Sequence, residues 1–199
     1  MKSICLFLGT GKKGFYIIKN TIEKEKKLCY QVIYMRVRLN VDTREQQNKH
    51  IIKAFKKHKI DYSSQKINEG DYSICIPEIN HTCKTVIERK ASLEELSANL
   101  CESKDENGYN RFERELIRAK EQGIKVILLI ENPNYYEDMM NHRHRTRLKP
   151  KAFRGMLFSL REKFGLEIVG IPKEYCGSYI YNVLYYALRE ELKIKGMKI

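Results

Sequence analysis

An unbroken run of apolar residues, Val126-Ile127-Leu128-Leu129-Ile130, stands between two charged stretches of the chain. A strand with one face in water alternates apolar and polar residues, whereas a strand covered on both faces need not alternate. The run therefore predicts a central strand that is buried on both sides. Such a strand needs helices packed above and below its sheet, which favours an α/β fold.

Shorter patterns on either side of the run predict the other elements. Asp71 to Ile76 alternates polar and apolar residues, which predicts a strand with one buried face. Ser92 and Glu95 form a capping-box pattern, which predicts a helix that starts directly after Lys90. Further strands are expected near 38–42, 61–66, 85–90 and 167–171, and further helices near 47–58, 109–122, 150–164 and 175–194. The expected fold is α/β, with a mixed central sheet flanked by helices.

Basic residues outnumber acidic ones, and the excess lies in two segments. Among 199 residues, 38 Lys and Arg stand against 25 Asp and Glu, a net charge of +13. Residues 1–40 carry nine basic and two acidic side chains, residues 139–161 carry seven basic and none acidic, and residues 41–138 carry 16 basic and 18 acidic. This balance indicates a polyanionic partner, nucleic acid or an anionic membrane, although a solvated basic surface gives the same count.

The sequence gives no indication of a membrane span or a secretion signal. The longest uncharged stretch, Tyr175 to Leu188, has 14 residues, whereas a bilayer needs roughly 18 to 20. The apolar stretch Ile4 to Leu8 is shorter than the roughly 7 to 15 residues of a signal-peptide core. The six cysteines are scattered without a Cys-x-x-Cys pair, which indicates a reduced compartment. We expect a cytoplasmic, nucleoid-associated protein without a membrane partner, and the abundance of Lys, Ile, Asn and Tyr suggests an AT-rich bacterial or phage genome.

Acidic residues recur where the predicted strands begin or end. They belong to Asp42-Thr43-Arg44-Glu45, Gly70-Asp71, Glu88-Arg89-Lys90 and Glu131. If a hairpin joins 71–76 to 85–90, Asp71 lies opposite Glu88 or Arg89, with opposed Cβ atoms roughly 4.5–5.5 Å apart. Two carboxylates at that separation repel each other unless a cation lies between them. Mg²⁺, which proteins hold by one or two carboxylates plus substrate phosphate, fits this requirement.

Alternation along the second strand of this hairpin separates its charged residues. Successive side chains of a strand point to opposite faces, so Glu88 and Lys90 share one face and Arg89 lies on the other. Lys90 can then point at a metal-bound water or a scissile phosphate, while Arg89 can bind a backbone phosphate or a carboxylate. The same residues would also make a surface hairpin with a salt bridge. Glu131 is expected either to belong to this constellation or to cap the edge of the sheet.

Three motifs resemble the nuclease domain of XPF-type endonucleases, the excision-repair cross-complementation group 4 family. They are Val41-Asp42-Thr43-Arg44-Glu45, Gly70-Asp71 and Ile87-Glu88-Arg89-Lys90. That family has V-D-x-R-E, then G-D, then E-R-K followed by a helix, and later R-F or R-L and a strand ending L-L-I-E. The later pieces are present as Arg111-Phe112 and Leu128-Leu129-Ile130-Glu131. The resemblance covers about 37–192, and E-R-K after G-D is its most specific part.

The resemblance implies a restriction-endonuclease-like core and Mg²⁺- or Mn²⁺-dependent cleavage of DNA phosphodiesters, usually near branch points or flaps. Asp71 and Glu88 would be the central metal ligands. Glu45, with Asp42 behind it, would complete or support the metal site. Lys90 would orient the attacking water or stabilise the developing charge. The metal would generate hydroxide and polarise the phosphate.

The resemblance also assigns basic residues and marks two departures. Arg44 and Arg89 match basic positions near the family's site, and Arg111 would contact phosphate or support the fold. The family often has an Asp a few residues after E-R-K, where this chain has Glu94-Glu95. Many relatives carry a C-terminal pair of helix-hairpin-helix motifs, and we expect this protein to lack them. We therefore expect a stand-alone nuclease domain over 38–199 and an accessory segment over 1–37, in which short apolar runs form strands.

Two further segments suggest interaction surfaces. Asn141 to Arg154 holds six cations in fourteen residues and a Pro at a helix start, which favours a phosphate-binding loop over a merely solvated one. The residues expected to contact nucleic acid there are Arg143, Arg145, Arg147, Lys149, Lys151 and Arg154. The last helix is apolar nearly all round, which predicts burial on both sides. We expect a homodimer through this helix, a habit that the resemblance also implies.

The leading hypothesis is a metal-dependent DNA endonuclease acting in repair, recombination or replication. It rests on Asp71, Glu88 and Lys90. The alternative from another class is a catalytically silent DNA-binding subunit of a nuclease complex, and a weaker alternative is a nuclease directed at RNA.

Overall fold

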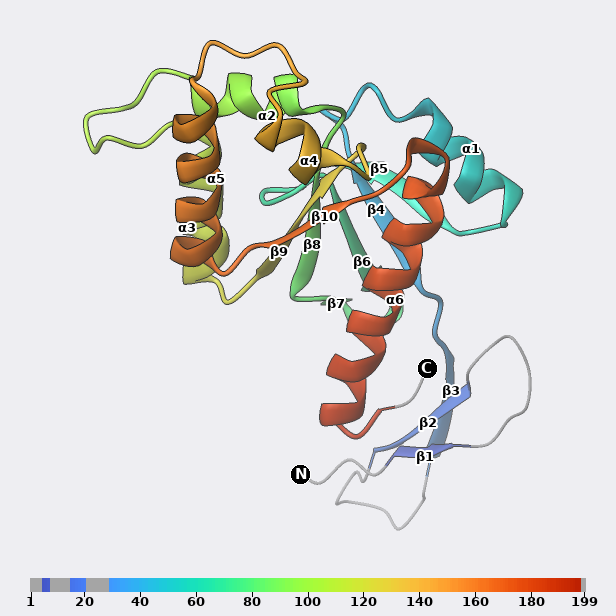
Figure 1. Ribbon diagram of the computed structural model, residues 1–199. Coiled ribbons are helices and arrows are strands. Elements are labelled where there is room, and N and C mark those ends of the chain that lie inside the picture. The colour runs from blue at the N-terminus through green and yellow to red at the C-terminus, as the bar shows by residue number, and fades with distance from the viewer. Residues whose placement is uncertain (1–4, 8–14, 21–28, 198–199) are drawn as a thin grey trace.

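The computed structural model describes residues 5–7, 15–20 and 29–197 of the chain (Figure 1). Its first elements form a small antiparallel sheet, in which the middle strand pairs with both others. These strands are β1 (Cys5–Phe7), β2 (Phe15–Asn20) and β3 (Cys29–Tyr34). The apolar runs near the N-terminus therefore form strands, as predicted. The accessory role of residues 1–37 stays a prediction.

The main sheet is mixed and has the order β10-β9-β8-β6-β4-β5, with β7 added against β6. Its strands are β4 (Arg38–Asp42), β5 (Tyr62–Gln65), β6 (Tyr72–Ile76), β7 (His81–Thr82), β8 (Thr85–Lys90), β9 (Lys125–Ile130) and β10 (Glu167–Gly170). Strands β8, β9 and β10 are parallel to one another, and β5 is parallel to β4. Strand β6 is antiparallel to both β4 and β8, so it joins the two parallel pairings into one sheet.

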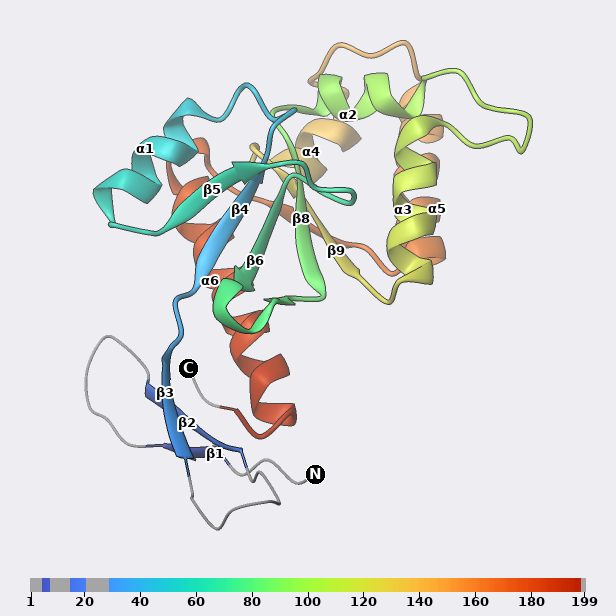
Figure 2. The same ribbon diagram turned by 180° about the vertical axis from the view of Figure 1, so that it is seen from behind.

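Helices cover both faces of this sheet (Figures 1 and 2). They are α1 (Lys49–Lys57), α2 (Leu93–Leu100), α3 (Arg111–Glu121), α4 (Tyr135–Met140), α5 (Pro150–Phe164) and α6 (Cys176–Ile194), with short 3₁₀ helices at Pro77–Ile79 and Lys173–Tyr175. Helices α1 and α6 contribute to one apolar core, and α2 to α5 contribute to the other. No helix in the described part of the chain is long and apolar enough to cross a membrane.

Strand β9 explains why the sequence needs an unbroken apolar run. Ile127 and Leu129 enter the core beside α1 and α6, whereas Val126, Leu128 and Ile130 enter the core beside α2 to α5. All five side chains are 6 % exposed or less. The predicted central strand buried on both faces is confirmed.

The hairpin that carries the acidic motifs has the predicted register at its functional end. Tyr72 of β6 pairs with Ile87 of β8, which brings Asp71 level with Glu88. At the other end, Ile76 pairs with His81 of β7, so the segment from β7 into β8 has two more residues between these pairs than β6 has. The prediction that β6 has only one buried face is wrong. Ser73, on the second face, is 3 % exposed and accepts a 3.1 Å hydrogen bond from the Asn40 amide, so polar neighbours cover it.

The remaining elements follow the sequence patterns, with three differences. Helix α4 and the two-residue strand β7 were not expected. The capping box at α2 is only partly formed, because Ser92 Oγ accepts from the Glu95 N–H while the Glu95 carboxylate accepts from Ala91 N–H instead. A complete capping box starts α3, between Asn110 and Glu113.

Candidate active site

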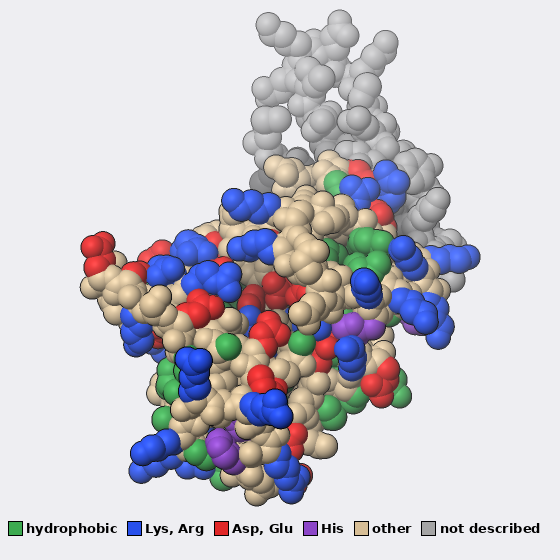
Figure 3. All heavy atoms as spheres, turned by 90° about the horizontal axis from the view of Figure 1, so that it is seen from above, with side chains coloured by type: hydrophobic (Ala, Val, Ile, Leu, Met, Phe, Trp, Pro, Cys, Tyr) green, Lys and Arg blue, Asp and Glu red, His purple; other side chains and the backbone are tan. Residues whose placement is uncertain are grey.

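A polar pocket of about 260 Å³ opens at one end of the main sheet. It is lined by the loop after β4, the start of β6, the end of β8, and helices α2 and α3. The lining residues are Arg44, Glu45, Gln46, Gln47, Asp71, Glu88, Arg89, Lys90, Glu95, Asn99, Arg111 and Glu115. Figure 3, which views this end of the molecule, shows acidic side chains near its middle with Lys and Arg side chains around them. The pocket combines the three sequence motifs in one place.

Asp71 is fixed at this pocket by the backbone on both sides. Its N–H donates to Ile87 O at 2.8 Å, and its carbonyl accepts from Asp42 N–H at 2.8 Å. Its carboxylate oxygen Oδ2 accepts from the Arg89 N–H at 2.8 Å. Burial raises the pKa of Asp71 well above its ordinary value, and the negative charges of Glu88 and Glu45 raise it further. This carboxylate is therefore held in place without a neutralising partner of its own.

Glu88 and Lys90 share one face of β8, as predicted. The Lys90 ammonium lies 2.7 Å from Glu88 Oε1 and 5.2 Å from the centre of the Phe112 ring, which fixes the lysine side chain. Burial alone would lower the pKa of Lys90, but the neighbouring Glu88 outweighs it and the pKa is raised. The lysine thus remains a cation within the pocket, next to the two carboxylates.

Gly70 is required by the turn that delivers Asp71 to the pocket. Its φ of +79° lies in the left-handed region, which side chains disfavour. A Cβ at this position would lie 3.0 Å from Val86 Cγ2 and 3.1 Å from Ile87 O. The backbone therefore passes so close to β8 that a side chain at position 70 would crowd Val86 and Ile87.

We expect Gly70→Ala to destabilise the protein more than Gly108→Ala. Both glycines have a φ of +79°, but a Cβ at Gly108 meets nothing within 4 Å. Gly108→Ala is the control, because it should lose only the free energy of placing a side chain in the left-handed region, about 1 to 2 kcal/mol. Gly70→Ala should lose this amount and, in addition, the cost of crowding Val86 and Ile87 on β8. Urea denaturation measures both free energies of unfolding. Equal losses in the two variants would contradict the close-approach explanation.

Arg89 lies on the opposite face of β8 and is tied into a buried network of ion pairs. Its Nε donates to Glu131 Oε1 at 2.9 Å, and its Nη1 lies 3.3 Å from both carboxylate oxygens of Glu45. His50 Nε2, on α1, lies 2.5 Å from the same Glu131 oxygen. The side chains of Arg89 and Glu131 are each 2 % exposed. The predicted DNA contact of Arg89 does not fit this position, because its guanidinium is buried among carboxylates; the alternative, binding a carboxylate, fits.

Asp42 supports the pocket from behind and does not line it. Its carboxylate accepts from the Arg44 N–H, from Arg44 Nε at 2.8 Å and Nη2 at 3.1 Å, and from the Ile67 N–H. Burial opposes ionisation, but the hydrogen bonds from Arg44 and Ile67 outweigh it and lower the pKa of Asp42. With every acceptor occupied, Asp42 fits a supporting role better than a reacting one.

Asp71 and Glu88 fit a divalent cation, but a third carboxylate is not gathered with them. Within the described residues, no three His, Cys, Asp or Glu side chains are close enough together to hold a metal ion. The prediction of Glu45 as a metal ligand is not borne out by this geometry, because Arg89 and the Gln47 N–H both donate to its carboxylate. Burial and the charge of Glu88 nevertheless disfavour the ionised form of Asp71 despite the nearby Lys90, a form that a bound cation would stabilise, and Mg²⁺ needs only one or two carboxylates beside substrate phosphate.

Helix α3 adds a carboxylate, Glu115, that belongs to none of the three sequence motifs. Glu115 lines the pocket, and its pKa is raised by burial and by the charge of Glu88. Arg111, one turn earlier on the same face of α3, also lines the pocket and is exposed. The helical spacing could have indicated Glu115. Arg111 and Glu115 are four residues apart and share one side of α3, next to the side that Phe112 and Leu116 bury in the core. After E-R-K, Glu95 lines the pocket, whereas Glu94 faces away and accepts from the Arg145 N–H.

The segment Asn141 to Arg154, called the basic segment below, lies beyond α2, beside the acidic pocket. Arg145 and Arg147 line a second cavity with the outer side of α2. Arg143 pairs with Glu137 at 2.8 Å, and Arg154 is half-buried against Met140. Lys149 and Lys151 are exposed, with Pro150 at the start of α5 as predicted. Contact of these side chains with nucleic acid stays a prediction.

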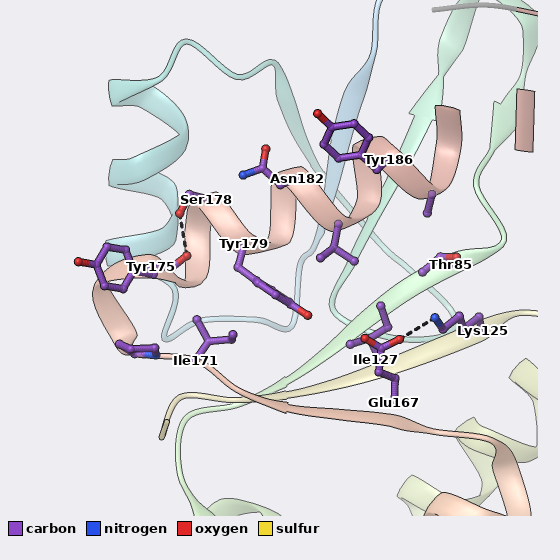
Figure 4. A pocket seen from close by; sticks show the side chains of 13 residues that line it. Thr85, Lys125, Ile127, Glu167, Ile171, Tyr175, Ser178, Tyr179, Asn182 and Tyr186 are labelled. Carbon is purple, nitrogen blue, oxygen red and sulfur yellow. Dashed lines mark hydrogen bonds and ion pairs between the residues drawn. The ribbon is translucent and has the colours of Figure 1, made fainter. Parts of the chain in front are cut away.

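An apolar groove of about 740 Å³ runs between α6 and the edge of the main sheet (Figure 4). Tyr179 extends from α6 towards the strands that carry Ile127 and Glu167. Tyr186, on the outward side of α6, is 53 % exposed. Only one face of α6 is therefore buried within the chain, and the prediction of burial on both sides is not met by the single chain.

Comparisons with known proteins give the family and the fold. A family model described as the ERCC4 domain matches residues 41–182. XPF from Aeropyrum pernix has a similar structure, with a TM-score of 0.56 and 18 % identity over 81 % of this chain and 64 % of that one. XPF from Aeropyrum pernix in complex with DNA gives a TM-score of 0.54 and 17 % identity, covering 78 % and 66 %.

This chain spans less than two thirds of the length of either structure. No curated protein matches the sequence. At this level of identity the structural likeness establishes the fold alone, and the predicted restriction-endonuclease-like core with a mixed sheet is confirmed.

Proposed function

The chain belongs to the ERCC4 domain family, and from that premise we propose that it is a metal-dependent DNA endonuclease. The observation that carries the proposal is the convergence of Asp71, Glu88 and Lys90 on one polar pocket. The similarity to an XPF structure determined with DNA supports DNA as the substrate class. We further propose branched, flap or single-strand-containing DNA as the preferred substrate, in repair, recombination or replication.

In the proposed reaction Asp71 and Glu88 would hold Mg²⁺ or Mn²⁺. When bound, such an ion lowers the pKa of a water ligand and polarises a phosphoryl oxygen. The protein contributes a fixed geometry, because the Arg89 N–H holds one oxygen of Asp71, while no donor among residues 29–197 is hydrogen-bonded to the other oxygen.

Lys90 supplies a positive charge where negative charge develops on the phosphate. Its ammonium is buried, fixed by Glu88 and Phe112, and remains protonated, so no reorientation is needed during the reaction. Arg44 and Arg111, at the rim of the pocket and each at least half exposed, can hold the phosphates on either side of the cut.

A panel of labelled flap, fork, bubble and linear duplex DNAs with Mg²⁺ or Mn²⁺ tests the proposal. We expect nicking of flap or fork substrates, no nicking in EDTA, and weaker nicking of linear duplex. Absence of cutting on every DNA would reject the endonuclease. An RNA of the same sequence, included in the panel, tests the RNA-directed alternative.

A catalytically silent DNA-binding subunit is the second candidate. The engagement of the Glu45 carboxylate by Arg89 and the Gln47 N–H, which draws it away from a metal, favours this candidate. Binding of the DNA panel without any turnover, in either metal, would support this candidate over the first.

We also propose that the chain forms a homodimer through α6. The groove beside α6 and the exposed Tyr186 offer the apolar surface that a second copy would cover. Light scattering coupled to size-exclusion chromatography should give twice the chain mass, and Tyr186→Glu should give a monomer that is still folded by circular dichroism. A monomeric wild-type protein at micromolar concentration would contradict this assignment.

A further inference from the structure

Helix α1 presents a face made of lysines to solvent. Ile51 and Phe55 are fully buried against the sheet, which fixes the rotation of the helix. On the opposite side four lysines lie within one to two turns of one another and are exposed. They are Lys49, Lys53, Lys56 and Lys57, and we call them the α1 lysine face.

These lysines have no acidic partner in the part of the chain that the structure describes. Some exposed lysines elsewhere are paired, such as Lys125 with Glu167 and Lys193 with Glu190, both at 2.6 Å. In contrast, no salt bridge among the described residues involves the α1 lysine face. Like charges three and four positions apart on a helix repel each other. The face therefore carries a concentrated charge that the fold itself does not neutralise.

The α1 lysine face begins next to the candidate active site. Gln46 and Gln47 line the pocket, and α1 starts two residues later at Lys49. The basic segment lies beyond α2, and Figures 1 and 2 show α1 and α2 on opposite sides of the strand ends. The acidic pocket is thus flanked by cations on both sides. Nine helical residues extend about 13 Å, along which a duplex carries roughly eight phosphates.

We propose that the α1 lysine face binds the phosphate backbone of a duplex arm that leaves the active-site pocket. The proposal rests on the proposed endonuclease function, because it places the arm relative to the site of cutting. An anionic membrane fits the same charge less well. Ile51 and Phe55 are buried, so α1 has no exposed apolar face of its own to enter a lipid surface.

A double substitution with a matched control tests this surface. Lys53→Gln/Lys56→Gln removes two charges and keeps side chains of equal helix propensity. Lys193→Gln/Lys195→Gln removes the same charge at the far end of α6, away from the pocket (Figure 1). Binding of a fluorescent fork DNA to each protein in EDTA is measured by anisotropy over a series of KCl concentrations. The α1 variant should bind more weakly, and its log–log salt slope should fall by about 1.8, or about 0.9 per lost phosphate contact.

Three outcomes would overturn the proposal. The α1 variant could keep the affinity and the salt slope of the wild-type protein, or the control variant could lose as much DNA affinity as the α1 variant. The α1 variant could also bind DNA normally and lose binding to phosphatidylserine vesicles. Nicking by the wild-type protein with Mn²⁺ is measured separately. A wild-type protein that nicks DNA while the α1 variant keeps its salt slope refutes this inference alone. A reduced slope with a wild-type protein that never cuts refutes the endonuclease and leaves the binding surface intact.

Discussion

The Asp71→Asn variant is expected to lose DNA cleavage by at least about a thousandfold and, without metal, to unfold at a higher temperature than the wild-type protein. A bound metal supplies several kcal/mol of transition-state stabilisation, and each 1.36 kcal/mol is a factor of ten in rate. Asparagine keeps the acceptor for the Arg89 N–H but removes a buried charge that Glu88 and Glu45 repel. Activity and stability should therefore change in opposite directions.

The pH dependence of this stabilisation follows from the raised pKa of Asp71. The ordinary pKa of an Asp carboxyl is 3.8. When the pKa is higher in the folded state, protonation stabilises the fold. This contribution is fully present at pH values below 3.8 and is lost as the pH rises through the raised pKa. The melting temperature of the metal-free wild-type protein should therefore fall relative to Asp71→Asn as the pH rises above about 4, and the two should converge at lower pH.

Asp42→Asn is the matched control, because the pKa of Asp42 is shifted the other way. Hydrogen bonds from Arg44 and Ile67 stabilise its charged form, so its contribution is present at neutral pH and lost as the pH falls. Asp42→Asn should lower the melting temperature at pH 7, where Asp71→Asn raises it. Differential scanning fluorimetry with EDTA from pH 4 to pH 8 measures both. A lower melting temperature for Asp71→Asn at pH 7 would contradict the unneutralised charge in the pocket.

The sequence predicted the parts of the fold that depend on periodicity. The apolar run at Val126–Ile130 identified the strand between two cores, and alternation placed Glu88 and Lys90 on one face of β8. Helix α4 was missed because Asn132-Pro133-Asn134 is typical of a turn, and the six helical residues that follow hold a single i,i+4 step of apolar side chains, Tyr135 to Met139 and Tyr136 to Met140. A helix of six residues that buries one side chain, Met139, is too short for its apolar spacing to be recognised.

The partners of the site residues could not be predicted in the same way. Alternation showed that Arg89 faces away from Lys90, but its partners Glu131 and Glu45 are more than forty residues away in the chain. Nothing local indicates which of two carboxylates, or a phosphate, will meet a guanidinium. The role of Glu45 depends on whether Arg89 pairs with it. Because the sequence does not show this pair, Glu45 was expected to bind metal, whereas the structure places it against Arg89.

Removal of the Arg89 side chain is expected to destabilise the protein more than any other single change at this site. In Arg89→Met, Glu131 loses the hydrogen bond from Arg89 Nε and keeps the contact with His50, so its 2 % exposed carboxylate loses the guanidinium that neutralises it. Breaking a buried ion pair from one side costs about 3 to 5 kcal/mol. Urea denaturation at pH 7 should show this loss with an unchanged m-value, which would indicate that the unfolded state is not altered.

The double variant Arg89→Met/Glu131→Met distinguishes this explanation from a simple loss of packing. It removes the uncompensated charge together with its partner, and two apolar side chains of suitable volume can fill the space. The double variant should therefore be more stable than Arg89→Met alone, even though it carries one substitution more. Glu45 remains in both variants, and its side chain, 9 % exposed at the pocket, can turn towards water when Arg89 is absent. A double variant less stable than the single one would mean that Arg89 acts through its contacts with the sheet rather than by neutralising Glu131.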